Sequence, residues 1–197
     1  AIDKIVIASQ RMSLLIKDLL EFSRLINPDT RFTPTNLEDV IQAVKHDFEL
    51  LIDEKNAEVI TQTLPVIDAV PLQMNQLFYN LIGNALKFTV QGVAPVVSIS
   101  GTVMEQGEVS IYIKNPLPVN YYKIAVSDNG IGIEEQYTKQ IFEVFKRLHS
   151  RSEYSGSGIG LALCRRIADN HNGAIYIESV PGQGTTFFVL LPEKQSV

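Results

Sequence analysis

Four short blocks rich in glycine or asparagine, in a fixed order, constrain this chain more than any other feature of its sequence. They cover residues 80–88 (NLIGNALKF), 128–133 (DNGIGI), 156–161 (GSGIGL) and 182–187 (GQGTTF). The first block places carboxamides and an ammonium group on a helix, and the others supply glycines where a backbone turns sharply or approaches a phosphate closely. Any one block is weak evidence, but the ordered set predicts one nucleotide pocket.

The first block belongs to a predicted helix over residues 71–88, with Pro71 suited to its first turn. At about 100° per residue, its polar side chains gather in one stripe: Gln73, Gln76, Asn80, Asn84 and Lys87. The apolar side chains point the other way and predict a core face: Met74, Phe78, Leu81, Ile82 and Ala85. Because carboxamides can ligate a hard cation and donate to phosphate, the polar stripe predicts a ligand-binding face; an ordinary exposed face is the alternative.

The second block follows a strand rich in β-forming residues and places Asp128 at the strand's end, with its carboxylate expected in a cleft. A buried carboxylate needs a hydrogen-bond donor, and Gly130 and Gly132 would let the chain pass a bound base without a Cβ clash. The DNG sequence is also a common turn signal, so a plain turn is the alternative.

The third block opens a helix whose free N–H groups and dipole favour an anion. It predicts a phosphate cradle made by Gly156, Ser157, Gly158, Gly160 and Leu161. The glycines of the fourth block, Gly182 and Gly184, are explained better by a tight hairpin turn than by ligand contact.

Between the second and third blocks, basic residues surround Phe142 and Phe145. This pattern predicts a mobile flap over the nucleotide, anchored by the aromatic pair, with a solvated basic loop as the alternative.

The order of the predicted elements indicates the fold class. Asn36 can cap a helix over about 37–55, with Asp39 completing a capping-box-like pair. Strands are expected at 57–64, 96–104, 109–114 and 121–128, a short helix near 135–145, a helix over 159–172 and a closing hairpin over 174–191. This order predicts the α+β class, as a two-layer α/β sandwich in which helices cover one face of a mixed sheet.

The first 27 residues carry an apolar repeat with spacings of three and four, which predicts a long helix that packs on partner helices. Its members are Ile5, Ala8, Met12, Leu15, Leu19, Phe22 and Ile26. We expect a homodimer through this helix, although the stripe could instead pack on the following domain. Residues 1–35 are therefore assigned to a stem helix and linker, 36–192 to one domain and 193–197 to a tail.

The composition of the chain limits the classes of partner that it could bind. A chain of 197 residues with 45% hydrophobic content can bury one good core and an additional helical piece. Its net charge of -5 argues against a general affinity for nucleic acid or anionic membranes. The chain has no run of about eighteen apolar residues, so we expect no membrane contact. The single cysteine, Cys164, fits a reducing cytoplasmic setting.

The four blocks, with the aromatic-rich segment IFEVFKRL between the second and third, resemble the ATP-binding domain of sensor histidine kinases, of the Bergerat (GHKL) type. The segment RMSLLIKDLLEFSRL similarly resembles the second helix of the kinase dimerisation hairpin. The resemblance implies ATP and Mg²⁺ as ligands, and a response-regulator receiver domain as a partner.

The same resemblance implies roles for single residues. Asn84 would ligate Mg²⁺, Asn80 would assist at the metal or its water, and Lys87 would contact phosphate. Phe88 would lie against the adenine ring, and Asp128 would accept a hydrogen bond from the adenine amine. Thr186 would help to hold that aspartate or its water, and Ile133 is counted with the residues that bind the base.

Two departures from the family pattern stand out. The phosphate-accepting histidine, followed by an acidic residue and shortly by a proline, is missing. His46-Asp47 imitates it, but without the proline, and His46 is expected to be an ordinary exposed helical residue, just as loop and capping roles suffice for His149 and His171. Residues 105–120 also form a longer stretch than the family needs, and we expect an extra strand or protrusion there.

Three hypotheses follow. The first is the ATP-binding and phosphotransfer core of a two-component sensor kinase, lacking its acceptor helix. The second is an ATPase clamp of the chaperone, gyrase and mismatch-repair families, which place a glutamate base where this chain has Asn80. The third is a non-catalytic nucleotide-sensing module whose output is dimerisation.

Overall fold

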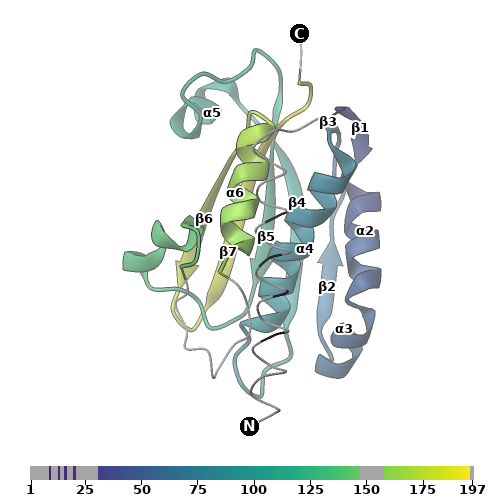
Figure 1. The fold of residues 1–197 in the computed structure, drawn as a ribbon, viewed down its shortest axis with the longest axis vertical. Helices are drawn as coiled ribbons and strands as arrows, with labels where there is room; N and C mark the ends of the chain where they lie inside the picture. Colours follow the sequence, from purple (N-terminus) through teal and green to yellow (C-terminus); the bar gives the residue numbers. More distant parts are fainter. Residues whose placement is uncertain are drawn as a thin grey trace.

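The computed structural model describes residues 31–146 and 158–195, together with positions 9, 13, 16 and 20 (Figure 1). The predicted stem helix lies almost wholly outside the described residues. The same holds for Gly156, Ser157 and His149, so the expectations for the stem and for these residues stay predictions.

The main sheet has five strands in the order β2-β4-β5-β7-β6. Strand β2 pairs with β4 in parallel, and the remaining neighbours are antiparallel. The strands are β2 (Glu58–Thr61), β4 (Val96–Met104), β5 (Tyr121–Asp128), β6 (Ala174–Val180) and β7 (Gly184–Pro192). The predicted mixed sheet and closing hairpin are therefore confirmed.

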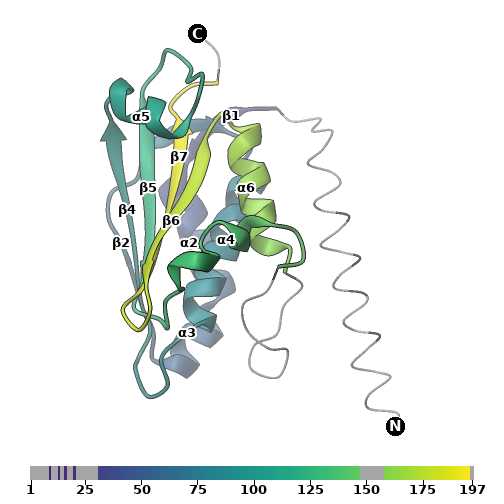
Figure 2. The same ribbon diagram turned by 90° about the vertical axis from the view of Figure 1, so that its left-hand side faces the viewer.

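Helices α2 (Leu37–Asp47), α4 (Pro71–Lys87) and α6 (Gly160–Asn170) cover one face of this sheet, as Figure 2 shows with the sheet nearly edge-on. The predicted apolar side of α4 faces the core, because Met74, Phe78, Leu81, Ile82 and Ala85 are all buried. They pack with inward residues of the strands such as Ile99, Val126 and Val189. This arrangement confirms the two-layer sandwich, in which burial of the apolar helix faces is the main stabilising contribution.

Helix α2 begins where its cap predicts, since the Asn36 side-chain oxygen accepts a hydrogen bond from the Glu38 N–H at 3.0 Å. The helix predicted over 37–55 is instead broken at Phe48, and a separate helix α3 (Glu49–Lys55) follows. The break lets the Phe48 ring stack on Tyr79 of α4 with centroids 4.5 Å apart. Tertiary packing therefore overrides the continuous helical pattern.

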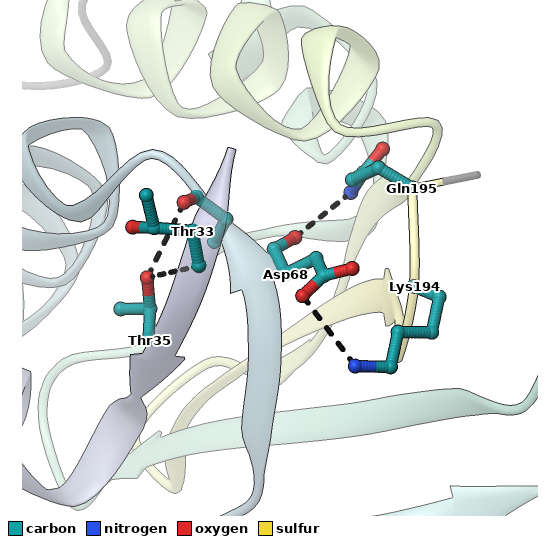
Figure 3. Close-up of polar contacts among 6 residues, drawn as sticks. Thr33, Thr35, Asp68, Lys194 and Gln195 are labelled. Carbon is teal, nitrogen blue, oxygen red and sulfur yellow. Dashed lines mark hydrogen bonds and ion pairs between the residues drawn. The ribbon is translucent and has the colours of Figure 1, made fainter. Parts of the chain in front are cut away.

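A small second sheet, which the sequence did not predict, joins β1 (Thr33–Asn36) to β3 (Val66–Ala69) in antiparallel register. The residues after β7 fasten onto it: the Asp68 N–H donates to the Glu193 carbonyl at 2.9 Å, and Lys194 pairs with the Asp68 carboxylate at 3.6 Å. Gln195 also donates to the Asp68 carbonyl (Figure 3). Residues 193–195 of the predicted tail are thus held against the domain.

The strand predicted at 109–114 is wrong, because α5 (Gln106–Tyr112) occupies this stretch. Both sides of β5 are paired, with β4 and β7, so this stretch does not extend the sheet beside it. Helix α5 instead buries Val109 against Tyr121 and Leu190 at one end of the sheet. Residues 105–120 therefore form the protrusion that was the other expectation for them.

The short helix predicted near 135–145 is two separate 3₁₀ turns, η1 (Glu135–Tyr137) and η2 (Gln140–Phe142). Phe142 is buried and packs edge-to-face on Phe187 of β7, with ring centroids 6.4 Å apart. Phe145 is exposed and adopts a positive φ of 65°. Only one member of the predicted aromatic pair therefore anchors this segment to the domain.

Candidate functional site

Asp128 is the last residue of β5, as predicted, and its carboxylate is half-buried. One carboxylate oxygen, Oδ1, accepts hydrogen bonds from the Gly130 N–H at 2.8 Å and from the Thr185 N–H at 3.2 Å. Burial raises the pKa of Asp128 above its ordinary value, and the two backbone donors act in the opposite direction. Since both donors use Oδ1, the second oxygen, Oδ2, is the atom that a ligand could engage.

Strand register determines which side chains stand beside Asp128. Thr185 of β7 is its direct partner, and Ser179 of β6 is paired with Thr185 in turn. Each of the three lies two residues from an inward apolar residue, namely Val126, Phe187 and Ile177. Because side chains alternate along a strand, this row of three lies on the helix-covered face.

Thr186 lies on the opposite face of the sheet, where its hydroxyl bonds the Ser127 hydroxyl at 2.9 Å. Thr186 therefore does not hold the aspartate directly, and the Thr185 N–H does so instead. The other predicted role of Thr186, holding a water beside the aspartate, stays a prediction. Sequence reasoning missed Thr185 and Ser179. The alternation of inward and outward residues along β7 was the signal that could have separated the two threonines.

The glycines of the second block are required by the protein's own backbone. A Cβ at Gly130 would lie 2.1 Å from the Phe88 carbonyl oxygen, which also accepts a hydrogen bond from the Ile131 N–H at 3.1 Å. Gly132 has a φ of 69°, and a Cβ there would lie 2.2 Å from the Val180 carbonyl oxygen. These glycines therefore dock the loop against the end of α4 and the β6–β7 turn. The expectation that they also make room for a base stays a prediction.

The polar stripe of α4 divides into two parts. Gln73 is buried, at 6% exposure, so it differs from the predicted ligand-facing position. Asn80 and Asn84 are half-buried. The Asn80 side-chain nitrogen donates to the Gln76 carbonyl at 2.9 Å, and its oxygen lies next to Gly160, where a Cβ would come within 2.6 Å. The third block thus meets the middle of α4 at Asn80, whereas the second block meets the C-terminal end of this helix at Phe88.

Lys87 and Phe88 close this helix. The Lys87 ammonium lies 4.6 Å from the centroid of the Phe88 ring, and the Lys55 ammonium donates to the Leu86 carbonyl at 2.8 Å. Both contacts place positive charge at the negative end of the helix dipole. Lys87 and Phe88 are half-buried beside the loop that follows Asp128.

The described part of the third block starts with Gly158, whose φ is 78°, and continues into α6 at Gly160. The Gly158 carbonyl accepts a hydrogen bond from the Phe145 N–H at 3.0 Å. Leu161 packs partly against the main core, and so does Ile133, which makes a protein contact where base binding was expected. The predicted role of Gly158 and Gly160 as part of a phosphate cradle stays a prediction.

The two described histidines lie away from this site. His46 is exposed, as predicted, and pairs only loosely with Glu49 at 3.5 Å. His171 is fully buried at the end of α6; its Nε2 accepts a hydrogen bond from the Val70 N–H at 3.1 Å, and burial lowers its pKa. Among the described residues, no three histidine, cysteine or acidic side chains gather as a metal site. No helix within the described ranges has the length and apolarity needed to span a bilayer.

The arrangement defines a class of protein: an α+β nucleotide-binding domain in which a strand-end aspartate, an asparagine-bearing helix and a glycine-opened helix converge. Residues 69–195 match the family described as histidine kinase-, DNA gyrase B-, and HSP90-like ATPase. The chain belongs to this family.

Similar proteins support this assignment. The chain is 35% identical to the phytochrome-like protein Cph1 of Synechocystis sp. over 97% of its own length and 24% of that protein. It is 32% identical to the adaptive-response sensory kinase SasA of Crocosphaera subtropica, over 92% of the chain and 45% of that protein. The structure of full-length ShkA in complex with AMPPNP is similar with a TM-score of 0.71 and 26% identity, over 94% of this chain and 36% of that one. The chain therefore spans a quarter to a half of these relatives.

Proposed function

We propose that this chain binds ATP with Mg²⁺ and delivers the γ-phosphate to a histidine on a dimerisation helix outside the chain. The observation that carries the proposal is that two glycine-bearing segments both contact the C-terminal half of α4. Phe88 contacts the loop that follows Asp128, and Asn80 contacts the first residue of α6. A base, a metal and a phosphate chain could thus be held by one continuous surface.

The base would be held by Asp128 and Phe88. The Oδ2 atom of Asp128 would accept a hydrogen bond from the adenine 6-amino group, while the Gly130 and Thr185 N–H groups fix Oδ1. Phe88 would pack on the ring, and Gly132 and Ile133 would shape the loop beside it. A carboxylate acceptor favours adenine over guanine, which presents an oxygen at the same position of the ring.

The metal would be held by Asn80 and Asn84, and the donor chemistry fits Mg²⁺. The Asn80 nitrogen is engaged by Gln76, so its oxygen is the atom available to a cation, and Asn84 presents a second carboxamide one turn further along α4. Mg²⁺ takes oxygen ligands and keeps several waters, so two carboxamides with substrate phosphates suffice. When bound, the metal neutralises charge on the phosphate chain.

The protein's contribution to phosphoryl transfer would be mainly positioning and charge. The Lys87 ammonium would neutralise phosphate charge, and the N-terminus of α6 from Gly158 to Leu161, with Gly156 and Ser157, would donate N–H groups to phosphate oxygens. An imidazole from the missing helix would attack the γ-phosphate in line. Asn80 carries no carboxylate that could activate water, which argues against the ATPase-clamp alternative.

We also propose that the parent protein is a homodimer through the stem at residues 1–27 and passes the phosphate to a response-regulator aspartate. Its histidine kinase relatives support both proposals. The buried, free thiol of Cys164 supports a cytoplasmic location.

Asn84→Ala tests the metal and nucleotide site. We expect it to weaken binding of ATP in the presence of Mg²⁺ by roughly tenfold or more, because even loss of an outer-shell partner of a metal ligand costs about that much. The effect should be smaller when EDTA replaces Mg²⁺. Asn75→Ala, on another face of α4, is the matched control and should bind as wild type. Calorimetry with both variants measures the difference. Wild-type affinity for Asn84→Ala, or equal loss in the control, would contradict the assignment.

Transfer of the phosphate is tested in the parent protein. With γ-phosphate-labelled ATP, wild type should form an acid-labile phosphoprotein, whereas the 197-residue chain alone should not label its own histidines. Labelling of the isolated chain would overturn the proposed need for an acceptor helix.

A further inference from the structure

The Ser179 hydroxyl connects three segments of the site. It accepts a hydrogen bond from the Ile133 N–H at 2.8 Å, donates to the Gly184 carbonyl at 2.9 Å, and lies 2.9 Å from the Thr185 hydroxyl. Ile133 belongs to the loop after Asp128, and Gly184 and Thr185 begin β7. This half-buried hydroxyl therefore links the loop after Asp128 to β7, the strand whose Thr185 N–H bonds the Asp128 carboxylate.

The direction of each bond follows from the capacity of a hydroxyl, which has one proton and two lone pairs. The Ser179 proton goes to the Gly184 carbonyl, so Ser179 is an acceptor in its other two bonds. The Thr185 hydroxyl must then donate to Ser179, because the second lone pair is the only remaining site. All three bonds are satisfied together in this one arrangement, which fixes the rotamer of Thr185.

Two routes lead from Ser179 to Asp128. Thr185, whose side chain Ser179 holds, donates its backbone N–H to Asp128 Oδ1 at 3.2 Å. Gly184, whose carbonyl Ser179 holds, packs directly on the Asp128 backbone, since a Cβ at Gly184 would lie 1.9 Å from the Asp128 carbonyl oxygen. The position of the carboxylate thus depends on groups that Ser179 keeps in place.

We propose that Ser179 is a positioning residue that sets the selectivity of this site for purines with a 6-amino group, by holding Thr185 and Gly184 so that Asp128 is aimed at that group. The inference rests on the proposed function, in which Asp128 accepts a hydrogen bond from adenine. Without the Ser179 hydroxyl, the Ile133 N–H, the Gly184 carbonyl and the Thr185 hydroxyl lose their shared partner. A small displacement of the Asp128 carboxylate would then remove much of the binding free energy that its hydrogen bond to the base contributes.

The test compares two ligands in each variant of the full chain: ATP and purine riboside 5′-triphosphate, which lacks only the 6-amino group, both with Mg²⁺. Wild type should prefer ATP by roughly tenfold or more, as expected for one hydrogen bond to a charged group. Ser179→Ala should reduce this preference to about threefold or less. A purely structural loss would weaken both ligands equally and leave their ratio unchanged, so the ratio reports positioning.

Two further variants keep the test decisive. Ser179→Thr retains the hydroxyl and should restore most of the preference, whereas Thr185→Val removes the partner hydroxyl and should lower the preference even where Ser179→Ala fails to fold. Ser127→Ala is the matched control, because Ser127 pairs with Thr186 on the opposite face of the sheet. It should keep the wild-type ratio.

The outcomes separate the two proposals. If wild type binds neither nucleotide, or binds both equally, the proposed function of Asp128 fails. If wild type prefers ATP but Ser179→Ala and Thr185→Val keep that preference, only the positioning role of Ser179 is overturned.

Discussion

Replacing Asp128 with asparagine should separate nucleotide affinity from stability. Asparagine keeps an oxygen that can accept from the Gly130 and Thr185 N–H groups, so both backbone bonds of the free protein survive. The Oδ2 atom of the carboxylate is replaced by an NH₂ group. It would then face the adenine amine as donor against donor, and the hydrogen bond to the base would be lost.

The expected loss of affinity follows from that single bond. A hydrogen bond to a charged group contributes about 1.5–3 kcal/mol, so the Kd for ATP should rise roughly 10- to 150-fold. Guanine presents an oxygen acceptor at the same ring position, and Asp128→Asn should therefore bind GTP better than wild type does. Calorimetry with ATP and GTP measures both changes.

The same substitution should leave the thermal stability of the free protein unchanged or raise it, although it lowers the affinity for ATP. Burial raises the pKa of Asp128 above its ordinary value of 3.8. The folded state therefore binds this proton more tightly than the unfolded chain, and the favourable contribution, present below pH 3.8, is lost as the pH rises through the raised pKa. At pH 7 the buried charge opposes folding, so Asp128→Asn should melt at the same or a higher temperature. Unchanged ATP affinity, or a clearly lower melting temperature, would refute the reasoning.

Three other predictions follow from the packing. Gly130→Ala should lower the free energy of unfolding by about 3 kcal/mol, because its Cβ would meet the Phe88 carbonyl. The control is Gly107→Ala on α5, where a Cβ meets nothing within 4 Å, and it should be neutral or stabilising by up to about 1 kcal/mol. Urea unfolding of the two variants measures the difference. Burial lowers the pKa of His171 below 6.5, so the unfolded chain takes up this proton first and stability should fall as the pH drops below 6.5, by at most about 1.4 kcal/mol per pH unit. His171→Gln should remove that component of the pH dependence in urea titrations at pH 7.5 and 5.5, and the exposed control His46→Gln should retain it. Burial also raises the pKa of the Cys164 thiol, so a thiol reagent should label the native protein no faster than the protein unfolds, and rapid labelling would contradict the buried placement.

Elements with strong local patterns were predictable. The apolar side of α4, the strands β4 and β5 and the closing hairpin all carry their periodicity within a few consecutive residues, and the structure confirms them. Elements that depend on distant partners were missed. Strand β1 exists because Thr33 pairs with Ala69, and residues 193–195 are held by contacts to Asp68. No local sequence pattern predicts either pairing.

The sequence by itself determined which chemical groups the site would contain: carboxamides and an ammonium group on α4, a carboxylate at the end of β5, and glycines at each turn. Only the tertiary structure decided which neighbours those groups would have. Thr185 and Thr186 are adjacent and chemically identical, yet one holds Asp128 and the other pairs with Ser127 on the far side of the sheet. The physical reason is that a strand's side chains alternate between faces, so a shift of one residue in register moves a side chain across the sheet, and register is set by pairing with distant strands.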